Sequence, residues 1–211
     1  SGNYFGTPEQ AFDSSEVFTN ALAAKENMRT ESFAQKLCVS SKGNVDCIKN
    51  AQLEEGQKGL LFSLSNHKVL YANGIYDKVY PASITKIMTA MLALQSGKLN
   101  DTVTITQDNV TLEDGSQVCG FVAGDQVTLD QLLHCLLVYS GNDAASAIAE
   151  YVGGNTENFV QMMNDYAAKL GCTGTHFSNP HGLQDENHYT TPYDIYLMLN
   201  EAFTYPEFTE I

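Results

Sequence analysis

A serine followed three residues later by a lysine is the arrangement in this chain best suited to do chemistry. Ser83 directly precedes the apolar segment 84–94, which predicts a buried helix, and Lys86 lies within that segment. Residues three apart share one helix face, so the Lys86 amine can reach the Ser83 hydroxyl. Because burial lowers the pKa of an ammonium group, we expect Lys86 to act as a base that makes Ser83 a nucleophile.

The surroundings of Ser83 favour this interpretation over the simpler one, in which Lys86 only extends its ammonium group to solvent. Tyr80-Pro81 forces an extended entry into the helix, and Gly97 ends the helix. Ser83 therefore lies at a helix N-terminus, where backbone N–H groups favour negative charge. An oxyanion could be held there.

A second element, Ser140-Gly141-Asn142-Asp143, separates two predicted helices. The first of these begins with a capping box formed by Thr128 and Gln131. Read alone, the tetrapeptide is a turn with a helix N-cap. Together with Ser83 and Lys86, the tetrapeptide is a candidate second part of the same active site.

Three stretches of this chain, residues 79–90, 140–145 and 176–183, resemble the penicillin-recognising serine enzymes. Within that group they resemble the serine-type D-Ala-D-Ala carboxypeptidases, also called low-molecular-mass penicillin-binding proteins. The resemblance implies an α+β penicillin-binding-protein/β-lactamase-like transpeptidase fold, an antiparallel sheet with flanking helices and a helical insertion.

The resemblance also implies roles for particular residues. Ser83 would be the acylated nucleophile and Lys86 its base, while Ser140 would relay a proton toward the leaving amine. Asn142 would hydrogen bond the substrate amide, and the Ser83 backbone N–H would be one oxyanion donor. The implied substrate is the D-Ala-D-Ala end of a peptidoglycan stem peptide, and β-lactams would acylate the same serine. No metal or organic cofactor is implied.

The third motif of the family, Lys-Thr-Gly, is not found in this chain. The only lysine after Lys98 is Lys169, which ends a predicted helix that begins near Thr156 and is capped by Gly171. Strands are predicted at 33–40, 58–64, 68–72 and 102–106, too few for the implied sheet. We therefore expect the C-terminal strands to be missing from this chain and to come from a C-terminal fragment of the same protein.

The chain divides into an N-terminal leader or short helix at 1–32 and an incomplete catalytic domain at 33–211. An inserted subdomain is expected at about 97–138. A long loop bordering the active site is the alternative interpretation of its first part.

Composition restricts the possible partners. The net charge of −14 disfavours binding to nucleic acid or to an anionic membrane surface. No apolar run approaches the roughly 20 residues of a membrane span, and Ser1-Gly2 does not open a signal peptide. We expect an extracytoplasmic protein whose signal peptide is absent from this sequence.

The cysteines and histidines fit a secreted protein better than a metal protein. Cys38 and Cys47 flank a polar loop and are candidates for a disulfide, while Cys135 is expected to be a small core residue. His176 and His181 are expected to make structural hydrogen bonds, and the histidines show no ligand spacing with the cysteines.

Two other functions use the same motifs. A class A β-lactamase also needs a glutamate that activates the deacylating water, and Glu150 and Glu157 are the nearest candidates after Ser140. The chain could instead be a noncatalytic penicillin-sensing or peptidoglycan-binding module, which the missing third motif favours.

Overall fold

The structure, a computed structural model, describes residues 37–40, 42–46 and 53–211. The predicted leader at 1–32 and Cys47 of the predicted disulfide lie outside these residues. The prediction of a strand at 33–40 is wrong for its described part, because residues 37–40 are not in a strand. Instead of joining a sheet, Cys38 donates its N–H to the Tyr196 hydroxyl and accepts a hydrogen bond from the Tyr193 hydroxyl.

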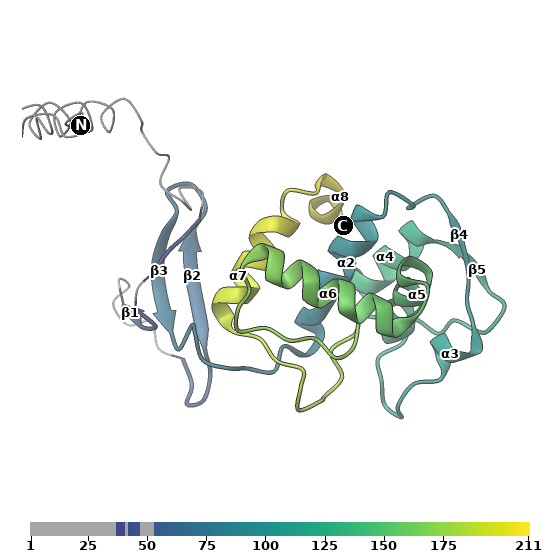
Figure 1. Ribbon diagram of the computed structural model, residues 1–211, viewed down its shortest axis with the longest axis horizontal. Helices are drawn as coiled ribbons and strands as arrows, with labels where there is room; N and C mark the ends of the chain where they lie inside the picture. Colours follow the sequence, from purple (N-terminus) through teal and green to yellow (C-terminus); the bar gives the residue numbers. More distant parts are fainter. Residues whose placement is uncertain (1–36, 41, 47–52) are drawn as a thin grey trace, which may run out of the picture.

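A three-stranded antiparallel sheet lies at one end of the molecule (Figure 1). Strands β2 (Gly59–Ser63) and β3 (Lys68–Asn73) form the predicted hairpin, with Leu60 opposite Ala72. The short strand β1 (Val45–Asp46) pairs with the other edge of β3. Among the described strands, β2 therefore lies at an edge of the sheet.

The predicted helix that follows Ser83 lies at the centre of the helical body. A 3-10 turn, η2 (Ala82–Thr85), carries Ser83 and leads into helix α2 (Lys86–Gln95). Most side chains of α2 are buried, as its continuous apolar sequence predicts. The helix ends before Gly97, whose backbone is left-handed with φ of +67°. Glycine adopts this conformation readily because it has no Cβ.

Five of the other described helices pack around α2 or beside it, and they supply most of the core. Two local predictions are confirmed here: Thr128 and Gln131 form a capping box, and Gly171 caps a helix in the left-handed conformation. The helices are α4 (Leu129–Val138), α5 (Asn142–Gly153), α6 (Thr156–Leu170), α7 (Pro192–Ala202) and α8 (Pro206–Glu210).

The segment after α2 forms a small β-ribbon at the opposite end of the molecule from the sheet (Figure 1). Strand β4 (Thr102–Thr104) pairs with β5 (Gln126–Thr128), and α3 (Gln107–Val110) lies between them in sequence. The predicted strand at 102–106 ends two residues early because Thr106 caps α3 in a capping box with Asn109. The inserted subdomain at 97–138 stays a prediction.

Helices and antiparallel sheets together give an α+β architecture. Within the described residues, every helix is too short or too polar to cross a lipid bilayer.

Candidate active site

Ser83 and Lys86 meet at the junction between η2 and α2. The Ser83 side chain is on an exposed turn, whereas Lys86 is only 3% exposed. The Lys86 Nζ donates to the Ser83 Oγ at 3.3 Å and to the carbonyl oxygen of His181 at 2.8 Å. The lysine is thus held against the serine, as the i and i+3 spacing predicts.

The surroundings of Lys86 favour its neutral form. Within the described residues, no carboxylate forms an ion pair with its amine. Burial therefore dominates, and it lowers the pKa of Lys86 to about 8. A large fraction of the amine is then neutral near pH 8 and able to take the Ser83 proton.

This pKa predicts how acylation of Ser83 depends on pH. Below pH 8 the Lys86 amine is mostly protonated, so the acylation rate should rise about tenfold per pH unit and level off above pH 8. The measurement is the second-order rate of labelling by a fluorescent penicillin between pH 5.5 and 9.5. A rate that is flat from pH 6 to 9 would contradict Lys86 as the base.

Ser140 reaches the same cleft from the loop between α4 and α5. Its backbone is left-handed, with φ of +61°, which is uncommon for a residue other than glycine. Ser83, Lys86 and Ser140 line one open cleft of about 330 Å³, together with Leu136 and other apolar side chains. The structure therefore brings together three of the four predicted site residues.

Asn142 is the fourth predicted site residue, and it does not line this cleft. It is buried as the first residue of α5, and its backbone N–H donates to the carbonyl oxygen of Gln117. Its predicted contact with a substrate amide stays a prediction.

The segment 176–183 lies against the turn that carries Ser83. The carbonyl oxygen of His181 accepts from Lys86, and that of Pro180 accepts from the Thr89 hydroxyl at 2.6 Å. Burial, the Lys86 ammonium group and His188 lower the pKa of His181 to about 4, and its Nδ1 accepts from the Leu183 N–H. His181 is therefore neutral near pH 7, and its contacts support a structural role.

Gly182 allows this close packing. A Cβ at Gly182 would overlap the carbonyl oxygen of Ala82, directly before Ser83, and its φ is +94°. We expect Gly182→Ala to destabilise the protein by about 2 kcal/mol or more and to slow acylation, because the turn with Ser83 must move. Chemical denaturation and penicillin labelling measure the two effects.

Gly171 offers a matched control, since its φ is +84° but a Cβ there would meet open space. Gly171→Ala should cost about 1 kcal/mol and leave labelling unchanged. Equal effects of the two substitutions would show that left-handed backbone strain alone, and not packing on the Ser83 turn, explains the Gly182 result.

Two contributors to the site were not found from the sequence. The Asp143 carboxylate, 1% exposed, accepts from the backbone N–H groups of Cys119, Gly120 and Phe121, so it fixes the loop beside Ser140. The Thr85 hydroxyl hydrogen bonds to His188 Nε2 at 2.7 Å beneath the Ser83 turn. From the sequence, the tetrapeptide that ends in Asp143 indicated only a turn with a helix N-cap. Thr85 was not found because its partner, His188, lies far away in the sequence.

Comparison with known proteins decides the family. A family model for D-alanyl-D-alanine carboxypeptidase matches residues 48–211. This chain belongs to the D-alanyl-D-alanine carboxypeptidase family. The resemblance stated from the three sequence stretches is confirmed.

Curated relatives of this carboxypeptidase-family chain are longer than the chain itself. It is 36% identical over 160 residues to the D-alanyl-D-alanine carboxypeptidase DacF of Bacillus subtilis, covering 74% of the chain and 41% of the relative. It is 40% identical over 149 residues to DacC of Escherichia coli, covering 66% of the chain and 37% of the relative. The chain thus spans about two fifths of the length of these relatives.

Solved structures with about 30% sequence identity share its fold. The D-alanyl-D-alanine carboxypeptidase of Mycobacterium tuberculosis matches with a TM-score of 0.71 at 30% identity, over 79% of this chain and 63% of that one. Penicillin binding protein 6B of Escherichia coli matches with a TM-score of 0.68 at 32% identity, over 78% and 56%. The predicted penicillin-binding-protein fold class is confirmed.

The glutamates weighed for a β-lactamase lie elsewhere in this carboxypeptidase fold. The Glu150 carboxylate accepts from the Thr106 hydroxyl at 2.9 Å and from the Asn109 amide at 2.6 Å. Glu150 and Glu157 line a separate polar cavity and not the cleft with Ser83. Neither is placed to activate a water at an acylated Ser83.

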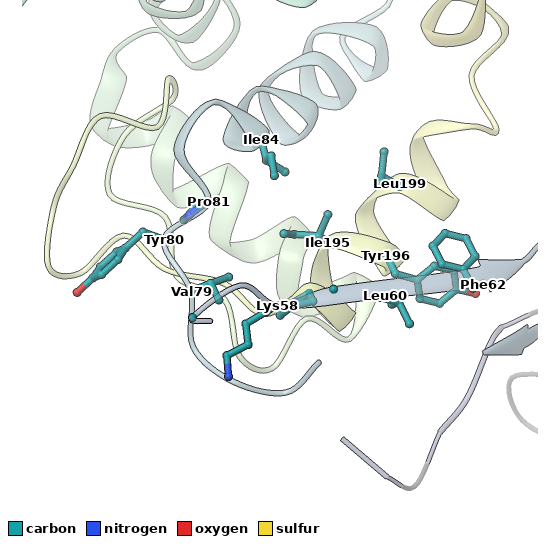
Figure 2. Close-up of a pocket in the computed structure, with 13 residues that line it drawn as sticks. Lys58, Leu60, Phe62, Val79, Tyr80, Pro81, Ile84, Ile195, Tyr196 and Leu199 are labelled. Carbon is teal, nitrogen blue, oxygen red and sulfur yellow. The ribbon is translucent and has the colours of Figure 1, made fainter. Parts of the chain in front are cut away.

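An apolar groove lies between β2 and α7 and reaches Ile84, the residue after Ser83 (Figure 2). Its volume is about 300 Å³. Leu60 and Phe62 come from β2 and Ile195 and Leu199 from α7, while Ile84 extends from the turn itself. The groove therefore runs from the edge of the sheet to the turn that carries Ser83.

Proposed function

We propose that this chain carries the nucleophile half of a serine D-Ala-D-Ala carboxypeptidase. Ser83 Oγ attacks the carbonyl carbon between the two D-alanines of a peptidoglycan stem peptide, and Lys86 takes the hydroxyl proton. Ser140 passes a proton to the leaving nitrogen, so the last D-alanine departs as an amine. Water then hydrolyses the ester on Ser83. β-Lactams acylate the same atom.

One observation carries this proposal: a buried lysine with a pKa of about 8 lies 3.3 Å from an exposed serine hydroxyl. This geometry supplies a nucleophile and a base in one cleft, with Ser140 beside them. The Ser83 backbone N–H serves as an oxyanion donor, and Asn142 holds the substrate amide. The relatives' names support the substrate, because each is called a D-alanyl-D-alanine carboxypeptidase.

The experiment is release of free alanine from an N-acylated peptide that ends in D-Ala-D-Ala, measured by liquid chromatography with mass detection, which responds to both enantiomers. We expect slow, Ser83-dependent release, and no release of alanine from the matched peptide that ends in D-Ala-L-Ala. Penicillin labelling without any D-alanine release would instead identify a noncatalytic penicillin-sensing module. Rapid turnover of penicillin would identify a β-lactamase.

We also propose that the groove between β2 and α7 binds a strand from a C-terminal fragment of the same protein, and that this fragment also carries the missing Lys-Thr-Gly motif. The edge position of β2 and the apolar side chains of Leu60 and Phe62 support this occupant. Because the motif adds a second oxyanion donor, its supply should raise turnover by about a hundredfold or more.

A chimera tests this second proposal, with the unmatched C-terminal part of DacF placed after Ile211. We expect the chimera to release D-alanine at least about a hundredfold faster than the chain alone. Leu60→Asp, in the groove, should remove that gain, whereas Leu61→Asp, on an exposed neighbouring position, should keep it. Equal effects of the two substitutions would overturn this placement of the strand.

The location follows from the substrate. Peptidoglycan stem peptides lie outside the cytoplasmic membrane, so we propose an extracytoplasmic protein that is secreted or associated with the cell envelope.

A further inference from the structure

Two cysteines meet beside the loop that carries Ser140. The Cys119 thiol lies 3.7 Å from the backbone oxygen of Cys135, to which it donates. It also packs against Gly141, where an added Cβ would collide with the sulfur. The Cys119 thiol is therefore held between α4 and the Ser140 loop.

Cys119 is fixed in this place by its backbone as well. Its N–H donates to the Asp143 carboxylate at 2.9 Å, and Gly120 and Phe121 donate to the same carboxylate. The carbonyl of Cys135 in turn accepts from the Gly141 N–H at 3.1 Å. Both cysteines are thus tied to the Ser140-Gly141-Asn142-Asp143 element, Cys135 to Gly141 and Cys119 to Asp143.

Solvent reaches both cysteines of this pair, because each is half-buried. Cys135 is half-buried and lines an open depression of about 490 Å³, together with Phe121, Val127 and His134. Cys38 and Cys172, in contrast, are buried.

We propose that Cys119 and Cys135 are a redox-active pair that closes into a disulfide in the oxidising surroundings of an extracytoplasmic protein. Cys135 Sγ attacks a small-molecule disulfide such as oxidised glutathione, and one glutathione thiol leaves. Cys119 Sγ then attacks the Cys135 sulfur of the mixed disulfide and releases the second glutathione. The pair gives two electrons to the small disulfide, and its two protons end on the two released thiols.

The ionisation of Cys119 agrees with this order. Burial, the Cys135 side chain and the Asp143 carboxylate raise the pKa of Cys119 to about 12. Cys119 is therefore protonated near pH 7 and is a poor first nucleophile. Once Cys135 is in a mixed disulfide, Cys119 attacks from within the same molecule, where its proximity compensates for its low thiolate fraction.

The closed disulfide would link α4 to the loop at 119–121 that Asp143 holds, next to Ser140. By removing conformations from the unfolded chain, this link should raise the Tm by roughly 5 °C or more. The oxidising surroundings rest on the proposed location, but the change in Tm does not depend on whether Ser83 is catalytic, so the two proposals can fail separately.

The test is a peptide map of the 211-residue protein after incubation with oxidised glutathione and blocking of free thiols with iodoacetamide. A protease that cuts at aspartate separates the two cysteines, because Asp125 and Asp130 lie between them. We expect one disulfide-linked pair of peptides with Cys119 and Cys135, together with the increase in Tm. Dithiothreitol should reverse both results.

Variants give the matched comparison. Cys119→Ala should abolish the rise in Tm on oxidation, whereas Cys172→Ala should keep it, because the Cys172 thiol is buried against the Asp194 carbonyl oxygen. If the wild-type map shows Cys119 and Cys135 alkylated, capped singly by glutathione, or linked to other cysteines, the proposal is wrong. The wild-type map decides this even if a variant fails to fold.

Discussion

Ser83→Ala should abolish covalent labelling by penicillin and release of D-alanine. Among the described residues, Ser83 is the only one whose hydroxyl group is hydrogen bonded to the buried Lys86 amine. The fold should be unchanged, since the Ser83 side chain lies on an exposed turn. Labelling is measured by intact-protein mass, and folding by thermal unfolding.

The control is Ser65→Ala in the hairpin turn between β2 and β3. The Ser65 hydroxyl group forms a hydrogen bond with the Ser63 hydroxyl group, far from Lys86 in the sequence. This variant should be labelled as the wild type is. If Ser83→Ala were labelled to the same stoichiometry as the control, the nucleophile would be another residue.

Lys86→Ala should reduce the acylation rate by about a hundredfold to ten thousandfold, because the base that takes the Ser83 proton is lost. The exposed serine itself remains, so slow labelling should continue at long times. Lys86→Arg should also be slow, since an arginine stays protonated and cannot serve as a base.

Structural damage must be separated from loss of the base, because Lys86 also binds the carbonyl oxygen of His181. Thermal unfolding of both variants measures that damage directly. Lys98→Ala, at a lysine whose amine lies over the Tyr151 ring, is the control and should acylate at the wild-type rate. A Lys86→Ala rate within threefold of wild type in a folded protein would rule out Lys86 as the base.

Features that depend on neighbouring residues were predicted well from the sequence. The hairpin, the helix after Ser83, the Thr128 capping box and the Gly171 cap all rest on contacts within a few residues. The meeting of Ser83 with Lys86 belongs to this group, because the two residues are three positions apart across the continuous turn from η2 into α2.

Features that depend on distant partners were not predicted. The segment at 37–40 has strand-like composition, yet hydroxyl groups of Tyr193 and Tyr196, more than 150 positions away, satisfy the backbone of Cys38. The role of Asp143 at the Cys119 loop likewise needs the tertiary fold. Periodicity and spacing contain no information about such partners.

The most direct test of the central claim is a tryptic peptide map of the protein after prolonged incubation with penicillin. Cleavage after Lys78 and Lys86 gives a peptide of residues 79–86 that contains Ser83. We predict that this peptide gains the mass of one penicillin and that fragmentation places it on Ser83. An adduct on another residue, or no adduct on a folded protein, would contradict the assignment of Ser83 as the nucleophile.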